Sequence, residues 1–265
     1  MHANGFDIAV TEFPAPGKPA LVLLHGIGSQ GNSWWPVSDA LAERFHVYQL
    51  DLRGHGESAK PEAGYSVEGY AADLQGVLEA LGLEKPAIMG HSLGALVTLF
   101  WASEHPDDAA ALVLEDPPLE THPEILQAFD GWIQLAAATP EQAAAWYREH
   151  YPDWTDEDCV RRAATMTSVA PGVFSDLRAA SAEALETGNT DRTPLLANIQ
   201  SPALLLRGNP ELGGMTTLDD AARFRELVAN GEVVDIMEAG HGLHRDATAA
   251  FLAAVLPFLA QHTNG

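Results

Sequence analysis

The sequence predicts an α/β fold: a mostly parallel sheet with helices on both faces and an inserted helical cap. Strand and helix patterns alternate over the first half of the chain and resume after about residue 200. Between about Pro117 and Arg192 the sequence shows helical stretches rich in alanine and aromatic residues, and no strand pattern. We therefore assign residues 1–117 and 193–265 to an α/β core and residues 118–192 to a helical cap, or lid.

The individual elements follow from hydrophobic spacing. The continuous apolar run Ala20–His25 is typical of a parallel strand that is buried on both faces. Ser66 is a suitable N-cap for a helix that Gly82 ends. The expected strands are Phe6–Phe13, Ala20–His25, His46–Asp51, Ala87–Met89, Ala111–Glu115, Pro202–Gly208 and Glu232–Glu238. The expected helices are Trp35–Phe45, Val67–Leu81, Leu93–Glu104, Leu218–Ala229 and Asp246–Ala260.

The most informative motif is Gly90-His91-Ser92-Leu93-Gly94, which follows the apolar segment Ala87–Met89. Small residues two positions either side of a serine permit a sharp, strained turn from a strand into a closely packed helix. Such a turn presents the Ser92 hydroxyl and places the Leu93 N–H beside it, at a helix N-terminus. The motif resembles the nucleophile elbow of the α/β-hydrolase family.

Other motifs extend this resemblance over nearly the whole chain, in the family's order: His25-Gly26 after the first apolar strand, the elbow, the cap and a glycine-flanked histidine, His241. The resemblance, closest to the serine esterase and lactonase branch, implies that Ser92 is the nucleophile and His241 the base. It also implies an oxyanion hole formed by the N–H groups of Ile27 and Leu93. His244 is a weaker candidate base, and His91 has no expected catalytic role.

The acid that orients His241 has two candidates. Relatives usually place it after the strand that follows the cap, where Glu211 lies, but the residue directly before Pro210 is Asn209, and an amide cannot stabilise an imidazolium. Some relatives place the acid after the preceding strand, where this chain has Asp116. The sequence leaves Glu211 and Asp116 equal.

Two other functions compete with serine hydrolysis. Gly26-Ile27-Gly28-Ser29-Gln30-Gly31 matches the glycine fingerprint of dinucleotide-binding oxidoreductases, with Asp51 near the expected distance, but that function leaves Ser92 and His241 unexplained. A non-catalytic, receptor-like binding protein on the same fold is the second alternative. We expect no cofactor and no metal, because the pair His241-x-x-His244 lacks a third ligand.

Composition restricts the partners. The formal net charge of −23, from 14 basic and 37 acidic residues, opposes binding to nucleic acids and anionic membranes. It also indicates an uncharged, partly apolar small-molecule substrate, since no basic pocket can be read from the sequence. The N-terminal residues lack a signal-peptide pattern, no apolar run is long enough to cross a membrane, and Cys159 is the single cysteine, so we expect a cytoplasmic protein. The oligomeric state cannot be read.

Overall fold

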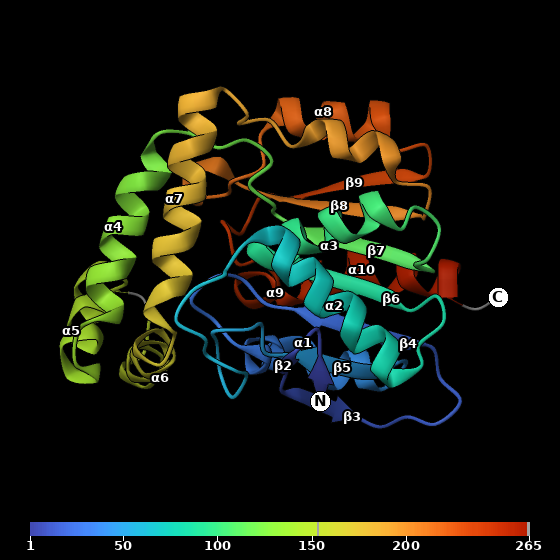
Figure 1. Ribbon diagram of the computed structural model, residues 1–265. Coiled ribbons are helices and arrows are strands. Elements are labelled where there is room, and N and C mark those ends of the chain that lie inside the picture. Colours follow the sequence, from blue (N-terminus) through green and yellow to red (C-terminus); the bar gives the residue numbers. More distant parts are fainter. Residues whose placement is uncertain (153, 264–265) are drawn as a thin grey trace.

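A seven-stranded sheet forms the centre of the chain in the computed structural model, which describes residues 1–152 and 154–263 (Figure 1). The strand order is β3-β5-β4-β6-β7-β8-β9; β3 pairs antiparallel to β5 and every other neighbouring pair is parallel. The strands are β3 (Val10–Phe13), β4 (Ala20–Leu24), β5 (His46–Leu50), β6 (Ala87–His91), β7 (Ala111–Glu115), β8 (Ala203–Gly208) and β9 (Gly231–Ile236).

Helices cover both faces of the sheet, as the sequence predicts. One face packs on α2 (Val67–Leu81), α3 (Leu93–Glu104) and α8 (Leu218–Leu227). The other packs on α1 (Trp35–Ala42), α9 (Leu243–Asp246) and α10 (Thr248–Thr263). The central strands are apolar on both sides, and every residue of β7 and β8 is buried. Two hydrophobic layers thus hold the sheet rigid beneath the loops that follow its strands.

Two expected elements differ in detail. The expected strand Phe6–Phe13 is divided, because Asn4 and Gly5 turn the chain back and pair β1 (His2–Ala3) with β2 (Phe6–Asp7) in a separate hairpin. The closing helix is preceded by the short α9, which directly follows the His241 loop. By contrast, α2 has the expected bounds and caps: Ser66 Oγ accepts the Gly69 N–H, and Gly82 adopts a left-handed conformation.

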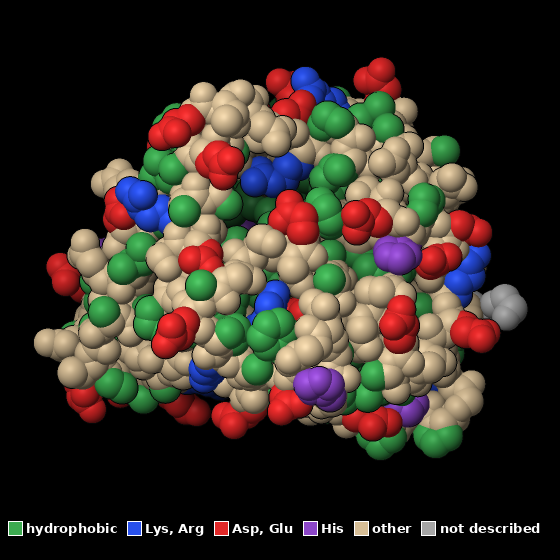
Figure 2. All heavy atoms as spheres, in the orientation of Figure 1, with side chains coloured by type: hydrophobic (Ala, Val, Ile, Leu, Met, Phe, Trp, Pro, Cys, Tyr) green, Lys and Arg blue, Asp and Glu red, His purple; other side chains and the backbone are tan. Residues whose placement is uncertain are grey.

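In the part of the chain that the structure describes, four α-helices lie between β7 and β8: α4 (Glu124–Ala136), α5 (Pro140–His150), α6 (Asp156–Thr167) and α7 (Pro171–Thr187). We call these four the cap helices. They stand together at one side of the sheet in Figure 1, next to the ends of the strands that carry the loops after β4 and β6. Figure 2 shows a hollow between them and the body of the molecule, with hydrophobic, Lys or Arg, and Asp or Glu side chains at its rim. Within the described residues, no helix is long and apolar enough to span a bilayer.

Candidate active site

Ser92 occupies a strained turn between β6 and α3, with φ 53° and ψ −114°. The turn is possible because its flanking residues are glycines. A Cβ atom on Gly90 would lie 2.2 Å from the carbonyl oxygen of Gly94, and one on Gly94 would lie 2.2 Å from that of Leu24. The strain holds the Ser92 side chain at the pocket wall, where it is 6% exposed, and makes Leu93 the first residue of α3. The Leu93 N–H is therefore one of the helix's initial donors.

His241 and Asp116 form a histidine–carboxylate pair, with 2.7 Å between His241 Nδ1 and Asp116 Oδ2. Asp116 follows β7 and is fully buried, while His241 lies in the loop between β9 and α9 and is partly exposed to the pocket. A carboxylate only accepts, so Nδ1 carries the proton and Nε2 is left free to accept one. Asp116 also accepts the backbone N–H groups of Gly208, Met215 and Thr216.

Glu211, the other sequence candidate, lies elsewhere. It belongs to an exposed turn, Pro210–Leu212, where its own N–H donates to Asn209 Oδ1. Among the described residues its carboxylate makes no contact with His241, whereas Asp116 does. The expectation that Glu211 and Asp116 are equal candidates is therefore corrected by the geometry: the strand that precedes the cap supplies the partner of His241.

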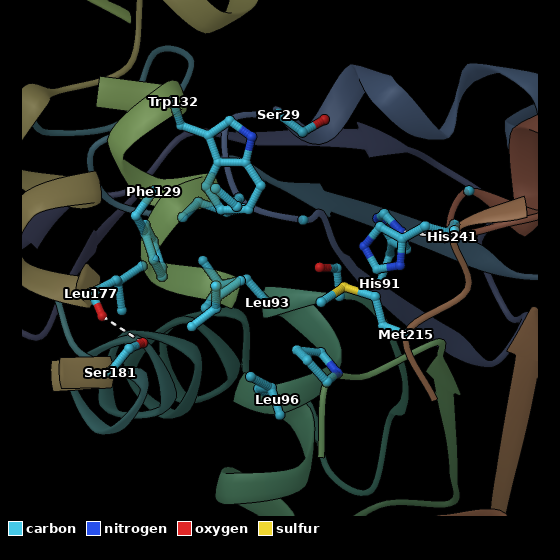
Figure 3. Close-up of a pocket in the computed structure, with 18 of the residues that line it drawn as sticks. Ser29, His91, Leu93, Leu96, Phe129, Trp132, Leu177, Ser181, Met215 and His241 are labelled. Carbon is cyan, nitrogen blue, oxygen red and sulfur yellow. Dashed lines mark hydrogen bonds between the residues drawn. The ribbon is translucent and has the colours of Figure 1, made fainter. Parts of the chain in front are cut away.

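Ser92 and His241 line the same pocket, although the described chain contains no direct hydrogen bond between their side chains. Such bonds are often long in unliganded enzymes and shorten when substrate binds. The ring of His91 lies beside His241, with 4.7 Å between ring centroids, and His91 Nε2 donates to the His241 carbonyl oxygen. The close-up shows His91 and His241 together at one end of the pocket, near Leu93 and Met215 (Figure 3).

The loop after β4 approaches the elbow closely. A Cβ atom on Gly26 would lie 3.2 Å from that of Ser92, so only a glycine lets Ile27 reach its place in the pocket wall. Two buried histidines shape the loop: His25 Nδ1 donates to the Gly26 carbonyl, and His55 Nε2 accepts the Gly28 N–H. Burial lowers the pKa of His25 to about 4 and that of His55 to about 3, so both are neutral at pH 7.

A second histidine–carboxylate pair lies behind the first. Glu115 and His244 are both buried; the Glu115 carboxylate accepts from His244 Nδ1 at 2.8 Å and from its backbone N–H at 2.9 Å. Burial raises the pKa of Glu115, but the attraction of His244 and His91 outweighs it and leaves that pKa below its ordinary value. The pair fixes the loop that carries His241 to the end of β7.

The pocket between the core and the cap helices has a volume of about 1810 Å³. Its apolar end is lined by residues that Figure 3 shows opposite the histidines: Leu96, Phe129, Trp132 and Leu177. Most ligand pockets measure about 300–1,000 Å³, so the volume does not restrict the substrate to a short acyl group. The cap aromatics expected from the sequence thus do contribute to a pocket wall.

The pocket wall carries charges of both signs. Four arginines line it, Arg161, Arg162, Arg192 and Arg245, among eight Asp and Glu residues, so the lining as a whole is acidic. The glycine fingerprint that suggested a competing dinucleotide site has a structural explanation: Asp51 accepts the N–H groups of Gly31 and Glu57, and its carboxylate thereby holds two loops of the core. Within the described residues, no group of three or more His, Cys, Asp or Glu side chains is placed to hold a metal ion.

The elbow, the histidine–carboxylate pair and the strand order together define an α/β hydrolase, and the chain matches the family model of the alpha/beta hydrolase fold over residues 19–248. It belongs to that family of hydrolases.

Two curated relatives align over most of their length. The chain is 30% identical to an N-formylmaleamate deformylase from Pseudomonas putida, over 98% of this chain and 95% of the relative. It is 28% identical to a 2-(acetamidomethylene)succinate hydrolase from Mesorhizobium japonicum, over 91% of this chain and 88% of the relative. Among solved structures, an N-formylmaleamic acid deformylase from Pseudomonas putida superposes with a TM-score of 0.81 at 26% identity, covering 96% of this chain and 98% of the other. An enol-lactonase from Burkholderia xenovorans shares the fold, with a TM-score of 0.74 at 23% identity over 98% of this chain and 99% of the other.

Proposed function

We propose that the protein is a serine hydrolase that cleaves a small to medium, partly apolar ester or lactone through an acyl-enzyme intermediate. The observation that carries the proposal is the hydrogen bond between His241 Nδ1 and the buried Asp116 carboxylate, beside a serine in an elbow. This bond fixes the tautomer in which Nε2 can take a proton, which a binding protein would have no need to maintain.

In the proposed reaction, Ser92 Oγ attacks the substrate carbonyl carbon while His241 Nε2 accepts the hydroxyl proton. The carbonyl oxygen becomes an oxyanion that accepts hydrogen bonds from the N–H groups of Ile27 and Leu93. The tetrahedral intermediate collapses, and His241 gives the proton to the leaving oxygen. A water molecule, deprotonated by His241, then attacks the acyl-enzyme and releases the acid and free Ser92.

Asp116 stabilises the imidazolium that forms on His241 in both steps. Its three other hydrogen bonds come from backbone N–H groups, so the carboxylate is held in place independently of the histidine. We assign the role of triad acid to Asp116 for this reason.

An N-acyl amide is the second candidate substrate class. It is favoured by the names of the two long-aligned relatives, a deformylase and an acetamidomethylene succinate hydrolase. The same serine and histidine would act on it, with the proton passing from His241 to a leaving nitrogen.

The test is labelling with a fluorophosphonate, followed by location of the adduct by mass spectrometry. We expect the adduct on Ser92 in the wild type, no adduct in the His241→Ala variant, and an unchanged adduct in Ser29→Ala, which removes another hydroxyl from the same pocket. Turnover of p-nitrophenyl acetate is expected to fall about 10⁴-fold or more in Ser92→Ala. A folded wild-type protein that takes no label on Ser92 would refute the proposal.

A further inference from the structure

Two arginines of the pocket form no ion pair within the described residues. Acidic residues outnumber basic ones 37 to 14, so a basic side chain shielded from solvent has many carboxylates available to it. In the described part of the chain, five basic side chains are buried or half-buried. Three of them form ion pairs, Arg53 with Asp73, Arg178 with Asp130 and Arg207 with Asp235. The other two, Arg162 and Arg192, both line the pocket.

Arg162 reaches from α6 to the loop after β4. Its Nη1 donates to the carbonyl oxygen of Gly28, and its guanidinium carbon lies 5.6 Å from the centroid of the Tyr147 ring. The neighbouring carboxylate on α6, Asp158, is already bound by Arg161 and by Thr155 Oγ1. Arg162 therefore keeps most of its five N–H donors unused, on a guanidinium that is held by the Gly28 carbonyl and the Tyr147 ring.

The position of Arg162 relative to the reacting atoms is informative. Gly28, whose carbonyl it holds, directly follows Ile27, the proposed oxyanion donor. Consecutive Cα atoms are about 3.8 Å apart, so the Arg162 guanidinium is anchored one residue away from the proposed oxyanion donor. A planar guanidinium with free donors matches a carboxylate, which it can bind through two parallel hydrogen bonds.

Arg192 has a different environment. Its Nη1 donates to Thr121 Oγ1 at 2.6 Å. Burial lowers the pKa of Arg192, and the nearby Glu68 carboxylate opposes that effect only in part. Arg192 thus already faces an acidic group and a hydroxyl, whereas Arg162 faces a backbone carbonyl and an aromatic ring.

We propose that Arg162 is a specificity-determining residue that binds a carboxylate group of the substrate, so that the preferred ester, lactone or amide is an anion. This inference rests on the proposed hydrolytic function, whose substrate class it narrows. It differs from the uncharged substrate expected from the net charge, because the unused donors of Arg162 offer one local site for an anion in a pocket whose other charged residues are mostly acidic.

The test compares matched ester pairs that differ by one charge: mono-p-nitrophenyl adipate against its methyl ester, and para-acetoxybenzoate against its methyl ester. The first pair carries the carboxylate on the acyl side and the second on the leaving-group side. We expect the wild type to prefer the acid of at least one pair. In Arg162→Gln the ratio of kcat/KM for acid over methyl ester should fall about 10- to 100-fold, mainly through KM, as expected for losing hydrogen bonds to a charged group. Arg162→Lys should restore part of the preference.

Arg148→Gln is the matched control, because Arg148 is a cap arginine that pairs with Asp156 outside the pocket, and its ratio should be unchanged. An unchanged ratio in Arg162→Gln, or a loss confined to Arg192→Gln, would overturn the assignment.

Binding of monomethyl adipate to Ser92→Ala protein, measured by calorimetry, reads the same site without turnover. Weaker binding in the Ser92→Ala/Arg162→Gln double variant than in Ser92→Ala supports the carboxylate site. If the wild type hydrolyses no ester but this difference in binding is present, the proposed hydrolytic function is refuted and the carboxylate site is not. Equal binding in the two proteins refutes the carboxylate site.

Discussion

Asp116→Asn isolates the contribution of one charge to the proposed triad. In the native protein Oδ1 accepts the N–H groups of Gly208 and Thr216, at 3.2 and 3.1 Å, while Oδ2 accepts those of Met215 and His241, both at 2.7 Å. An asparagine keeps its oxygen where two backbone donors meet and turns its NH₂ group toward Met215 and His241. The Met215 N–H and the His241 Nδ1–H then both face an NH₂ donor, where the native protein has a carboxylate oxygen that accepts from them.

The expected loss of activity follows from the tautomer. The new NH₂ group can only donate, so His241 must accept at Nδ1 and carry its proton on Nε2. In that form Nε2 cannot take the Ser92 proton, and kcat should fall about 10⁴-fold. The loss of stability should be smaller, about 1–3 kcal/mol, because the half-buried Met215 N–H loses its acceptor.

The assay is the hydrolysis of p-nitrophenyl acetate, with Ser92→Ala as the blank and thermal unfolding as the check on folding. Glu211→Gln is the matched control: it removes the other sequence candidate from an exposed turn and should change kcat by less than about twofold. A folded Asp116→Asn protein that retains more than about a tenth of the activity would refute the reasoning, as would a collapse of activity in Glu211→Gln.

Three further predictions concern the loop after β4 and the buried titratable groups. Gly26→Ala places a Cβ 2.9 Å from His91 Nδ1 and should cut kcat about 10²- to 10³-fold by displacing one oxyanion donor; unchanged kcat would show that the loop takes no part. Glu115→Gln should cost about 3 kcal/mol in urea unfolding at pH 7. The pKa of Glu115 is lowered in the folded protein, so the difference in free energy of unfolding between wild type and variant should be fully present above the ordinary pKa of a glutamate. It should shrink as the pH falls through the lowered pKa. A difference that grows in acid contradicts the pairing of Glu115 with His244. The pKa of His25 is about 4 in the folded protein, so as the pH falls the unfolded chain takes up a proton first. The free energy of unfolding of the wild type should therefore decline below about pH 6.5, and His25 alone should account for a loss of about 3 kcal/mol at pH 4. A free energy of unfolding that does not change over this pH range contradicts the prediction.

The elbow was readable from the sequence because its constraint is local. A serine between glycines, after an apolar strand and before a helix, allows few backbone conformations, and the structure shows Ser92 in the strained one. The core strands were readable for a related reason: runs such as β4 and β8 are apolar on both faces, which only a covered parallel sheet accommodates.

The partner of His241 was not readable, because it depends on strand order and loop path. Asp116 and Glu211 follow two strands, β7 and β8, that are neighbours in the sheet, and either could reach the histidine in principle. What separates them is the turn at Pro210–Leu212, which leaves Glu211 in solvent, and the Met215 and Thr216 N–H groups, which converge on Asp116. Neither feature has a sequence pattern.

The role of Arg162 was unreadable for a similar reason. Nothing in the helix Asp156–Thr167 distinguishes it from Arg161, its neighbour in sequence. Arg161 turns toward Asp158 and solvent, and Arg162 turns toward the loop after β4. Both line the pocket, and only the packing of α6 over that loop decides that Arg162 is the one that reaches the Gly28 carbonyl.

The adjacent carboxylates at the end of β7 show how the fold separates support from chemistry. Glu115 binds His244 within the buried core, and Asp116 binds His241 at the pocket wall. His91 lies between the two histidines and donates to the His241 carbonyl oxygen, so the loop from 241 to 244 is fixed at three points by the core alone. These three contacts, which hold the base, all come from the core and not from the cap helices. It follows that changes in the cap, including those at Arg162, should alter substrate preference while leaving the histidine–carboxylate geometry intact.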